Sequence, residues 1–413
     1  MMYQHFETNQ ETIIRFFFYC LGLTKDKKPP AGFEELPEEK WAIVLMDAQK
    51  HSILPLLYYH LTQFHKEIQI PTNILKQLKQ AYFHSSLENT QVYYDLSKVL
   101  GEANISNIPI IVLKGVAIAS SIYPNVALRP MSDLDLLVKS EDIRMVHELL
   151  LRLGWKCMNG RVQSENRIKF NHALLYKKYE LYIDLHLKII ELPKLNPWTN
   201  AVSIKIDFNK TLVLGTGDII LFLCNHLCKH ITSSSYVTEL IKFYDIAQVL
   251  RKSKESIDWN YIVQNAYINQ CEHIIYCILD FIKTEFEEDI PTDVLSKLKN
   301  KKFTVQISDV LYKNKKLPDT IYGFEPIAGI IRIISSRWLI PKSVKVSDVI
   351  RYTFKRIFPS KEYMLTHYPI HQTRFFFIYY LIRIPIGVAK ILKILYKHIS
   401  YSMKNRINRS INN

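Results

Sequence analysis

The chain has 413 residues, of which 48% are hydrophobic and 23% are charged, and these values exclude a largely disordered protein. The length predicts two or three domains, and 11 glycines beside 25 tyrosines and 20 phenylalanines favour a helix-rich protein over an all-β one. The six cysteines form no dense disulfide framework and the N-terminus lacks the layout of a secretory signal, so we expect a cytoplasmic protein.

The net charge of +15 is concentrated at one end of the chain. From residue 341 onward there are 14 Lys or Arg residues against two acidic residues, an excess of +12 that leaves +3 for the first 340 residues. The basic character therefore belongs to the C-terminal tail.

Residues 1–100 are predicted to be helical. Pro37, followed by two glutamates, marks a helix start, and apolar residues then recur at helical spacing from Trp41. His51 follows at the end of that helix, and we interpret it as a structural residue. A second amphipathic helix is predicted over 87–100, before a polar segment at 104–107.

The stretch from Pro109 to Val138 carries the strongest signal. An apolar run ends in Lys114-Gly115, a turn follows at Pro124-Asn125, and Arg129-Pro130 leads into Ser-Asp-Leu-Asp-Leu-Leu-Val. Side chains alternate between the two faces of a strand, so a strand over 133–138 projects Asp133 and Asp135 from the same face. Adjacent carboxylates repel unless a cation lies between them, and a hard divalent ion would serve. The alternative is a pair of solvated carboxylates on an exposed strand.

Lys114-Gly115 lies where a strand would pass into a helix. Glycine permits close backbone approach and a helix N-terminus attracts phosphate, so Lys114 is a candidate phosphate contact, with a solvated lysine as the alternative. Arg129 either reaches phosphate oxygens or pairs with one of the aspartates.

Further along, 141–153 reads as an amphipathic helix ended by Gly154, followed by a hairpin. Its strands are expected at 173–176 and 181–187, around Lys177-Lys178. In the second strand Asp184 and His186 share one face with Tyr182. Residues 211–217 are predicted to form a turn-rich boundary.

The next helix contains Cys-Asn-His-Leu-Cys-Lys-His, which suggests zinc. The cysteine pair and the histidine pair are offset by about 200° around the helix, so they cannot hold one ion together. We therefore assign Cys224 and Cys228 to the core. Residues 251–340 are mixed and mostly helical, and we assign no chemistry to them.

The tail differs from the rest of the chain. Residues 375–395 are apolar but contain too many charges for a spanning helix, so no transmembrane span is predicted. Basic residues recur every seven positions from Arg383 to Lys404 and would form one stripe on a helix. Three interpretations remain open: a helix docked on the protein, a helix at an anionic membrane surface, and an RNA-binding segment.

These motifs carry a resemblance. Leu-Lys-Gly, Tyr-Pro and Leu-Arg-Pro-Met-Ser-Asp-Leu-Asp-Leu-Leu-Val, together with Ala-Gln-Lys-His-Ser-Ile-Leu-Pro-Leu-Leu at 48–57 and Tyr-Ile-Asp-Leu-His-Leu at 182–187, resemble the uncharacterised nucleotidyltransferase family of the DNA polymerase β-like superfamily. Residues 221–250, with two histidines and Asp-Ile-Ala, resemble its downstream helical segment. The similarity spans most of residues 40–250 in the family's order.

The resemblance implies an α+β fold with a polymerase-β-like nucleotidyltransferase core, a small mixed sheet with helices, flanked by N- and C-terminal helical regions. We expect a helical region over 1–100, the core over 101–213, a helical domain over 214–340 and the basic helical tail over 341–413. It further implies an enzyme that moves a nucleoside monophosphate from an NTP to an unidentified acceptor by a two-metal mechanism with Mg²⁺ or Mn²⁺.

The site residues implied are of three kinds. The catalytic and metal-binding carboxylates are Asp133, Asp135 and Asp184. The nucleotide-binding residues are Lys114, Gly115, Arg129 and Ser132. Accessory residues of unassigned role are His186, His226, His230 and Asp245. The acceptor is open, and the tail adds an anionic membrane surface or RNA as a candidate partner, with peripheral association at the inner membrane surface as one option.

Two other functions are consistent with the sequence. One is a toxin-like nucleotidyltransferase that modifies RNA or protein. The other is a catalytically silent module that binds nucleotide or acts as a scaffold, although the presence of all three carboxylates argues against it.

Overall fold

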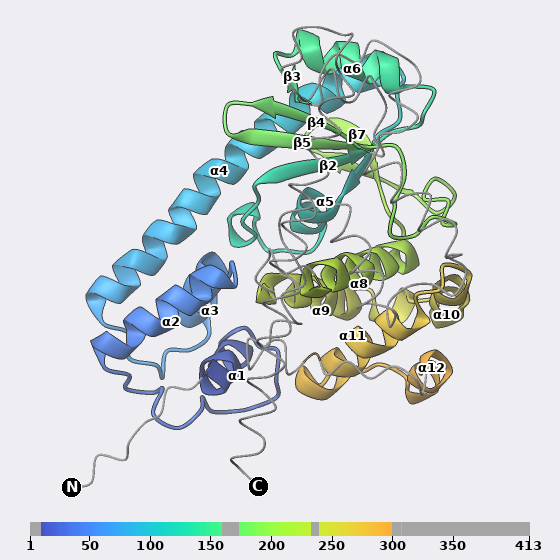
Figure 1. The fold of residues 1–413 in the computed structure, drawn as a ribbon. Helices are drawn as coiled ribbons and strands as arrows, with labels where there is room; N and C mark the ends of the chain where they lie inside the picture. The colour runs from blue at the N-terminus through green and yellow to red at the C-terminus, as the bar shows by residue number, and fades with distance from the viewer. Residues whose placement is uncertain (1–9, 159–172, 233–238, 300–306, 308–413) are drawn as a thin grey trace, which may run out of the picture. The chain divides into compact units, whose positions relative to one another are not determined.

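The computed structural model describes residues 10–158, 173–232, 239–299 and Ile307 (Figure 1). The chain forms two units, Met1–Lys315 and Lys316–Asn413, and every described residue belongs to the first. The basic tail predicted over 341–413 lies outside the described residues.

The N-terminal part is helical, as predicted. Its helices are α1 (Gln10–Cys20), α2 (Glu38–Lys50), α3 (Leu54–Gln63) and α4 (Thr72–Ile105). Pro37 is the N-cap residue of α2, where the fixed φ of proline suits a helix start. The helix predicted over 87–100 is part of the 34-residue α4, which extends from the α2–α3 pair to the sheet (Figure 1).

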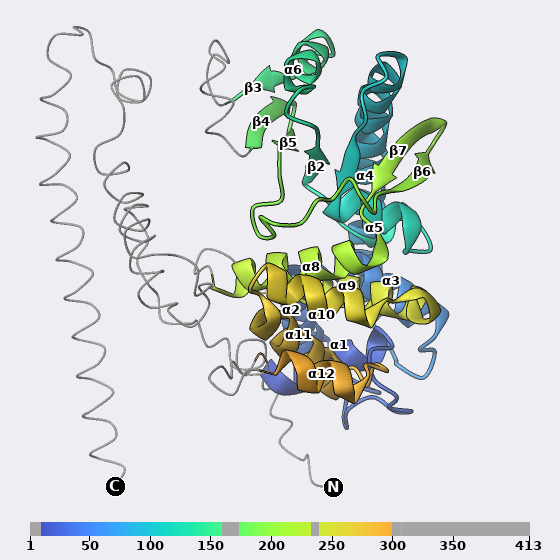
Figure 2. The same ribbon diagram turned by 90° about the vertical axis from the view of Figure 1, so that its right-hand side faces the viewer.

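One mixed sheet of seven strands is formed within the described residues (Figure 2). Its strands are β1 (Ile111–Leu113), β2 (Asp133–Leu137), β3 (Lys156–Cys157), β4 (Ala173–Lys178), β5 (Leu181–His186), β6 (Val202–Ile206) and β7 (Asn209–Val213). Their order is β3-β4-β5-β2-β1-β7-β6. β2 is parallel to β5 and antiparallel to β1, so the aspartate-bearing strand has neighbours on both sides.

The two faces of the sheet have different surroundings. Leu134 and Leu136 of β2 are buried in a core made with α4 and with α6 (Ile143–Arg152). Because side chains alternate along a strand, Asp133 and Asp135 project from the opposite face. On that face Leu137 joins the core that contains the C-terminal helices. The sheet therefore presents its acidic side chains away from α4 and α6.

The β4–β5 hairpin confirms the two predicted strands but moves the turn. Lys178 pairs with Leu181, so the turn residues are Tyr179 and Glu180 and not Lys177-Lys178. The strand continues through Lys178 because its ammonium bonds to the buried carboxylate of Asp95, 2.9 Å away. That long-range partner is invisible in the local sequence.

The β6–β7 hairpin was not predicted, and the turn-rich boundary expected at 211–217 is wrong over its first half. Thr211 lies in β7, and its hydroxyl donates to the carbonyl of Ile110 at 3.0 Å, beside the parallel pairing of β7 with β1. The two strands of this hairpin are largely half-buried or exposed. They therefore lack the clear alternation of apolar and polar residues that would have predicted them.

Between β1 and β2 the chain forms α5 (Lys114–Ser121) and a single 3₁₀ turn, η1 (Val126–Leu128). β1 passes directly into α5, as Leu-Lys-Gly predicted. The buried side chains of Ser85 and Asn89 on α4 donate to backbone carbonyls of 126, 127 and 129, which fixes this segment against α4. The predicted helix at 141–153 is confirmed as α6, and Gly154 follows it with φ +86°, a conformation that favours glycine.

The remaining helices form the second core with α1, α2 and α3. They are α8 (Thr216–Thr232), α9 (Leu240–Lys252), α10 (Trp259–Ile268), α11 (Glu272–Glu285) and α12 (Thr292–Leu298), with a 3₁₀ turn η2 (Lys254–Ser256). Cys224 is buried and Cys228 packs against this core, as predicted. His51 caps α2, and its Nδ1 accepts from the backbone N–H of Leu240 at 3.3 Å, which is a structural contact.

The fold is of the predicted α+β class, a mixed sheet with helical regions on either side of it in the sequence. The finer domain boundaries at 100, 213 and 340 stay predictions. Among the helices within the described ranges, none has both the length and the apolarity needed to cross a membrane.

Candidate functional site

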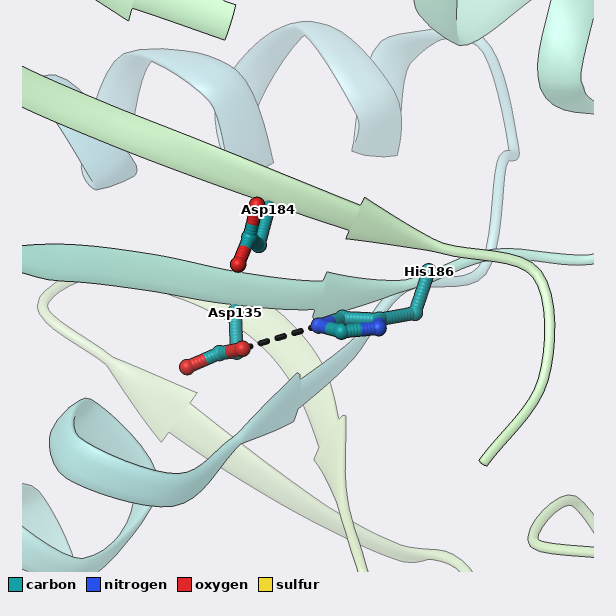
Figure 3. Close-up of side chains that lie close together, drawn as sticks. All are labelled: Asp135, Asp184 and His186. Atoms are coloured by element: carbon teal, nitrogen blue, oxygen red, sulfur yellow. Dashed lines mark hydrogen bonds and ion pairs between the residues drawn. The ribbon is translucent and has the colours of Figure 1, made fainter. Parts of the chain in front are cut away.

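Two strands bring the predicted carboxylates together. In the parallel β2–β5 ladder Asp135 is paired with Asp184 and Leu137 with His186. Figure 3 shows the Asp135 and Asp184 side chains on neighbouring strands, with the His186 ring directed at Asp135. Nε2 of His186 donates to Oδ1 of Asp135 at 2.8 Å.

Asp135, Asp184 and His186 form a group that could hold a metal ion. One ligand atom from each lies within 4.8 Å of the others. The expected set contained Asp133 in place of His186. Asp133 lies at the exposed start of β2 with Ser132 before it, on the same face as Asp135 but outside this group of three. His186 was predicted only as an accessory residue, so the structure brings it closer to the carboxylates than expected.

Lys114 also bonds to the carboxylate of Asp135. Its Nζ lies 2.6 Å from Oδ1 of Asp135, and its side chain is only 18% exposed, so the alternative of a solvated lysine is wrong. Lys114 has φ +47°, a left-handed conformation that costs a non-glycine residue about 1–2 kcal/mol. The junction between β1 and α5 is therefore strained at the residue that faces the carboxylates.

The charges in this group shift one another's pKa. Burial would raise the pKa of Asp135, but the His186 and Lys114 groups outweigh it and hold that pKa well below its usual value. Burial lowers the pKa of Lys114, but the Asp135 carboxylate raises it, and the net result is a raised pKa. The pKa of Asp133 is raised by desolvation and by the adjacent Asp135 carboxylate. Asp135 is thus an anion at neutral pH, while at Asp133 burial and the Asp135 charge outweigh the opposing charges of Lys114 and Arg129.

Gly115 allows close packing of side chains beside the site. A Cβ at this position would lie 2.6 Å from Nη1 of Arg129 and 3.2 Å from the side chain of Met131. The first of these contacts is shorter than real Cβ atoms show and the second is tight, so glycine lets the guanidinium lie against the start of α5.

Arg129 pairs with Asp245, which was predicted only as an accessory residue, and not with either aspartate of the Asp-Leu-Asp motif. Its Nε and Nη2 donate to both oxygens of Asp245 on α9, at 2.7 to 3.1 Å, and the hydroxyl of Tyr123 donates to Asp245 at 2.7 Å. Asp245 is 1% exposed and Arg129 13%. The pairing joins the segment before β2 to α9, and it involves neither Asp133 nor Asp135.

Helix α8 lies beside Lys114. The Phe222 ring centroid lies 6.0 Å from Nζ of Lys114, and one turn later His226 and His230 hydrogen-bond to each other through Nε2 atoms 3.0 Å apart. Burial and the Lys114 ammonium lower the pKa of His226 to about 2, and burial and Lys242 lower that of His230 to about 4. Both histidines are neutral at physiological pH.

The donor set suits a hard divalent cation. Carboxylate oxygens are the ligands that Mg²⁺ and Mn²⁺ prefer, and Asp133, Asp135 and Asp184 share one face of two neighbouring strands. The ammonium of Lys114 already supplies positive charge at Asp135, which shows that this position stabilises a cation. The residues therefore fit such an ion.

Two residues near the site were missed by sequence reasoning. Tyr123 belongs to the Tyr-Pro motif. Its hydrogen bond to Asp245 becomes visible only in the folded chain, because the two residues are far apart in the sequence. Lys242 lies three residues before Asp245, a helical spacing that places both on one face and could have identified it.

Comparisons with known proteins give four results. A family model described as an uncharacterised nucleotidyltransferase matches residues 37–287. A solution structure of the antibiotic-resistance factor ANT(2'')-Ia is similar at 16% identity and a TM-score of 0.33, over 45% of this chain and 98% of that one. A crystal structure of ANT(2'')-Ia in complex with adenylyl-2''-tobramycin is similar at 15% identity and a TM-score of 0.33, over 44% and 98%. A search of curated proteins finds no match.

The family assignment rests on the family model. Its match covers more than half of the 413 residues and includes β1 through α11, with all the site residues named above. The resemblance expected from the Leu-Lys-Gly and Asp-Leu-Asp motifs is confirmed. The chain belongs to the uncharacterised nucleotidyltransferase family.

Proposed function

We propose that the protein transfers a nucleoside monophosphate from an NTP to an acceptor hydroxyl, with Mg²⁺ or Mn²⁺ held by Asp133, Asp135 and Asp184. The observation that carries the proposal is the pairing of Asp135 with Asp184 on parallel strands, with His186 in the same group. The family, a nucleotidyltransferase one, supports the reaction class.

In this reaction the acceptor oxygen forms a bond to the α-phosphorus of the NTP, and the bond between that phosphorus and the bridging oxygen to the β-phosphate breaks. The electron pair of the broken bond leaves with pyrophosphate, and the acceptor loses its proton to solvent. A bound divalent cation would supply charge neutralisation at the α-phosphate as the transition state forms.

The chain's own residues would orient the nucleotide. Lys114 faces the carboxylates from the β1–α5 junction, where α5 begins without a side-chain cap, a position suited to phosphate oxygens. Arg129 lies against Gly115, held there by Asp245. Its pairing with Asp245 gives it a fixed orientation, which supports a role for its third nitrogen, Nη1, toward a phosphate.

His186 would act through Asp135. Its Nε2–H donates to the oxygen that also accepts from Lys114, so the carboxylate is fixed by two donors from different elements. A fixed carboxylate presents its other oxygen in one direction, which is what an ion of strict geometry requires. His186 also belongs to the metal-capable group itself, so it is either a positioning residue or a further ligand.

The proposal is tested by metal-dependent nucleotide binding. Wild-type protein is titrated with each NTP in the presence and absence of Mn²⁺ and compared with Asp184→Asn. Asp293→Asn is the matched control, since Asp293 is an exposed carboxylate whose ion pair, at 3.2 Å, is with the likewise exposed Lys297 of the same helix. Binding that needs Mn²⁺ and is lost in Asp184→Asn alone supports the site. Equal binding by all three proteins with and without Mn²⁺ would refute it.

A further inference from the structure

Lys242 on α9 is a largely buried lysine that neither the motifs nor the resemblance assigned. Its side chain is 17% exposed, and its ammonium forms an ion pair with Glu239 one turn earlier. Glu239 is itself held by Ser52, whose hydroxyl donates to it at 2.8 Å. Burying an ammonium is costly, and one partly exposed ion pair offsets only part of that cost.

The helix places Lys242 beside the candidate site. Lys242 and Asp245 are three residues apart, so they lie on one face of α9, and Asp245 is bonded to Arg129. Besides its partner Glu239, four charged groups act on Lys242: Arg129, Asp245, Asp133 and Lys114. These groups come from α5, from the segment after η1, from β2 and from α9.

The charges of three cations act at Asp133, the first residue of β2. Asp133 acts on the charges of Lys114, Arg129 and Lys242 alike. Lys114 is bonded to Asp135, Arg129 to Asp245 and Lys242 to Glu239, so each cation is held in place by a carboxylate other than Asp133. These cations are held in place beside a candidate metal ligand. Such an arrangement would bind a polyanion that carries a divalent ion with it.

We propose, on the basis of the function proposed above, that Lys242 binds the β- and γ-phosphates of the NTP. Lys114 is bonded to Asp135, in the group where the α-phosphate must lie for transfer, and Lys242 lies on a different helix, on the same face of α9 as Asp245, the partner of Arg129. An ammonium is a compact point charge that suits the terminal phosphates, which carry most of the charge of a triphosphate.

The electrostatics of Lys242 fit a site prepared for an anion. Burial, followed by Arg129, lowers its pKa to about 8, while Asp245 and Asp133 act in the opposite direction. His230 of α8 also faces it and is neutral. A bound polyphosphate would raise the pKa of Lys242 again, so nucleotide affinity should fall as the pH rises from 7 to 9.5.

The competing explanation is structural: the Glu239–Lys242 pair would serve only to fix the start of α9 against Ser52. The two explanations differ in what Glu239→Gln does. If the pair is structural, Glu239→Gln and Lys242→Met have the same effect. If Lys242 binds phosphate, Glu239→Gln removes the carboxylate that holds the cation but keeps the cation itself, so it should weaken binding much less than Lys242→Met does.

The test uses the full chain with Mg²⁺ and measures dissociation constants for each NTP, for its monophosphate and for inorganic tripolyphosphate. The variants are Lys242→Met, Lys242→Arg and Glu239→Gln, with Lys254→Met as the control. Lys254 is an exposed lysine with its own ion pair to Asp289, so its replacement removes the same charge elsewhere.

Lys242→Met is expected to weaken NTP and tripolyphosphate binding on the order of 10- to 100-fold, the range for a hydrogen bond to a charged group, with little change for the monophosphate. Glu239→Gln should bind NTP much more tightly than Lys242→Met does, and Lys254→Met should bind as the wild type does. Lys242→Arg should retain binding and lose the decline between pH 7 and 9.5.

Wild-type affinity for NTP in a folded Lys242→Met protein would overturn the assignment while leaving the proposed function intact. If Lys242→Met does not fold, the pH profiles of the wild type and of Lys242→Arg decide: a decline in the first alone supports the assignment, and matching profiles overturn it. No Mg²⁺-dependent binding of any NTP by the wild type would overturn the proposed function and this inference together.

Discussion

Asp135 and Asp184 lie opposite each other on the parallel strands β2 and β5, and the same Asp135 oxygen accepts hydrogen bonds from Lys114 and His186. The two aspartates therefore differ in what they already contact. Asp135 is 3% exposed at its side chain and compensated by a lysine, whereas Asp184 is half-buried. Replacing each aspartate should therefore have a different effect on the stability of the protein.

Asp184→Asn should lower nucleotidyl transfer by about 100-fold or more, because one carboxylate of the metal-binding group is lost. The metal-free protein should keep its melting temperature, since a carboxamide of the same size relieves repulsion with Asp135. Added Mn²⁺ should raise the melting temperature of the wild type, by an amount set by its dissociation constant, but not that of the variant. Thermal unfolding with and without Mn²⁺ measures this.

Asp135→Asn provides the contrast. It should also abolish transfer, but it leaves the Lys114 ammonium buried without its anion, so the free energy of unfolding should fall by about 3 kcal/mol. Equal stability of the two variants would mean that the Lys114–Asp135 pair contributes nothing to the fold.

Gly115→Ala should destabilise the protein by about 1–3 kcal/mol and displace the Arg129 guanidinium, because the added Cβ would meet Nη1 at 2.6 Å. Gly101→Ala is the matched control. Gly101 lies inside α4 and its Cβ would meet Asn209 at an ordinary 3.5 Å, so alanine should stabilise the helix by about 0.5–1 kcal/mol. Chemical denaturation of both variants checks the opposite signs.

Asp245→Asn should cost about 3–5 kcal/mol of unfolding free energy, because Arg129 would remain buried as an uncompensated cation. Tyr123→Phe removes only one hydrogen bond to the same carboxylate and should cost about 2 kcal/mol. Urea denaturation of the two variants gives both values. A small effect of Asp245→Asn would show that the Arg129 guanidinium finds water or another partner.

Stability should fall as the pH is lowered from about 6.5 to 4. Burial lowers the pKa of His60 to about 4, so in this range the unfolded chain takes up a proton that the folded protein does not. His60 alone would contribute up to about 3 kcal/mol at 1.36 kcal/mol per pKa unit. His230 adds in the same direction, since its pKa is also lowered to about 4.

His60→Gln tests this dependence. Denaturation at pH 7 and pH 5 should show a smaller loss of stability in the variant than in the wild type, because the variant has one fewer histidine to titrate. An unchanged pH slope would show that His60 is accessible to protons in the folded protein.

Local patterns predicted the elements that carry the carboxylates. Alternation placed Asp133 and Asp135 on one face, and Asp184 and His186 on one face, and the observed strands confirm both. The side-chain period of a strand is a local property, so it can be read from the sequence. The parallel register that sets Asp135 against Asp184 is not local, and it needed the structure.

The contacts that the sequence missed join residues far apart in the chain. Arg129 meets Asp245 on α9, and Lys178 stays in β4 through Asp95 of α4. Neither pairing leaves a trace in spacing or composition. The β6–β7 hairpin was missed for a different reason, because its partly exposed strands lack a clear alternation of apolar and polar residues.

The central claim is that the α-phosphoryl group of an NTP, with its nucleoside, is moved to an acceptor. The direct measurement incubates wild-type protein and Asp184→Asn with Mg²⁺ or Mn²⁺, a cell extract, and NTPs labelled at either the α- or the γ-phosphate. The proposed function predicts that α-label alone becomes attached to an acceptor, with γ-label released as pyrophosphate, in the wild type only. Transfer of γ-label to the acceptor, or equal α-label transfer by Asp184→Asn, would contradict it.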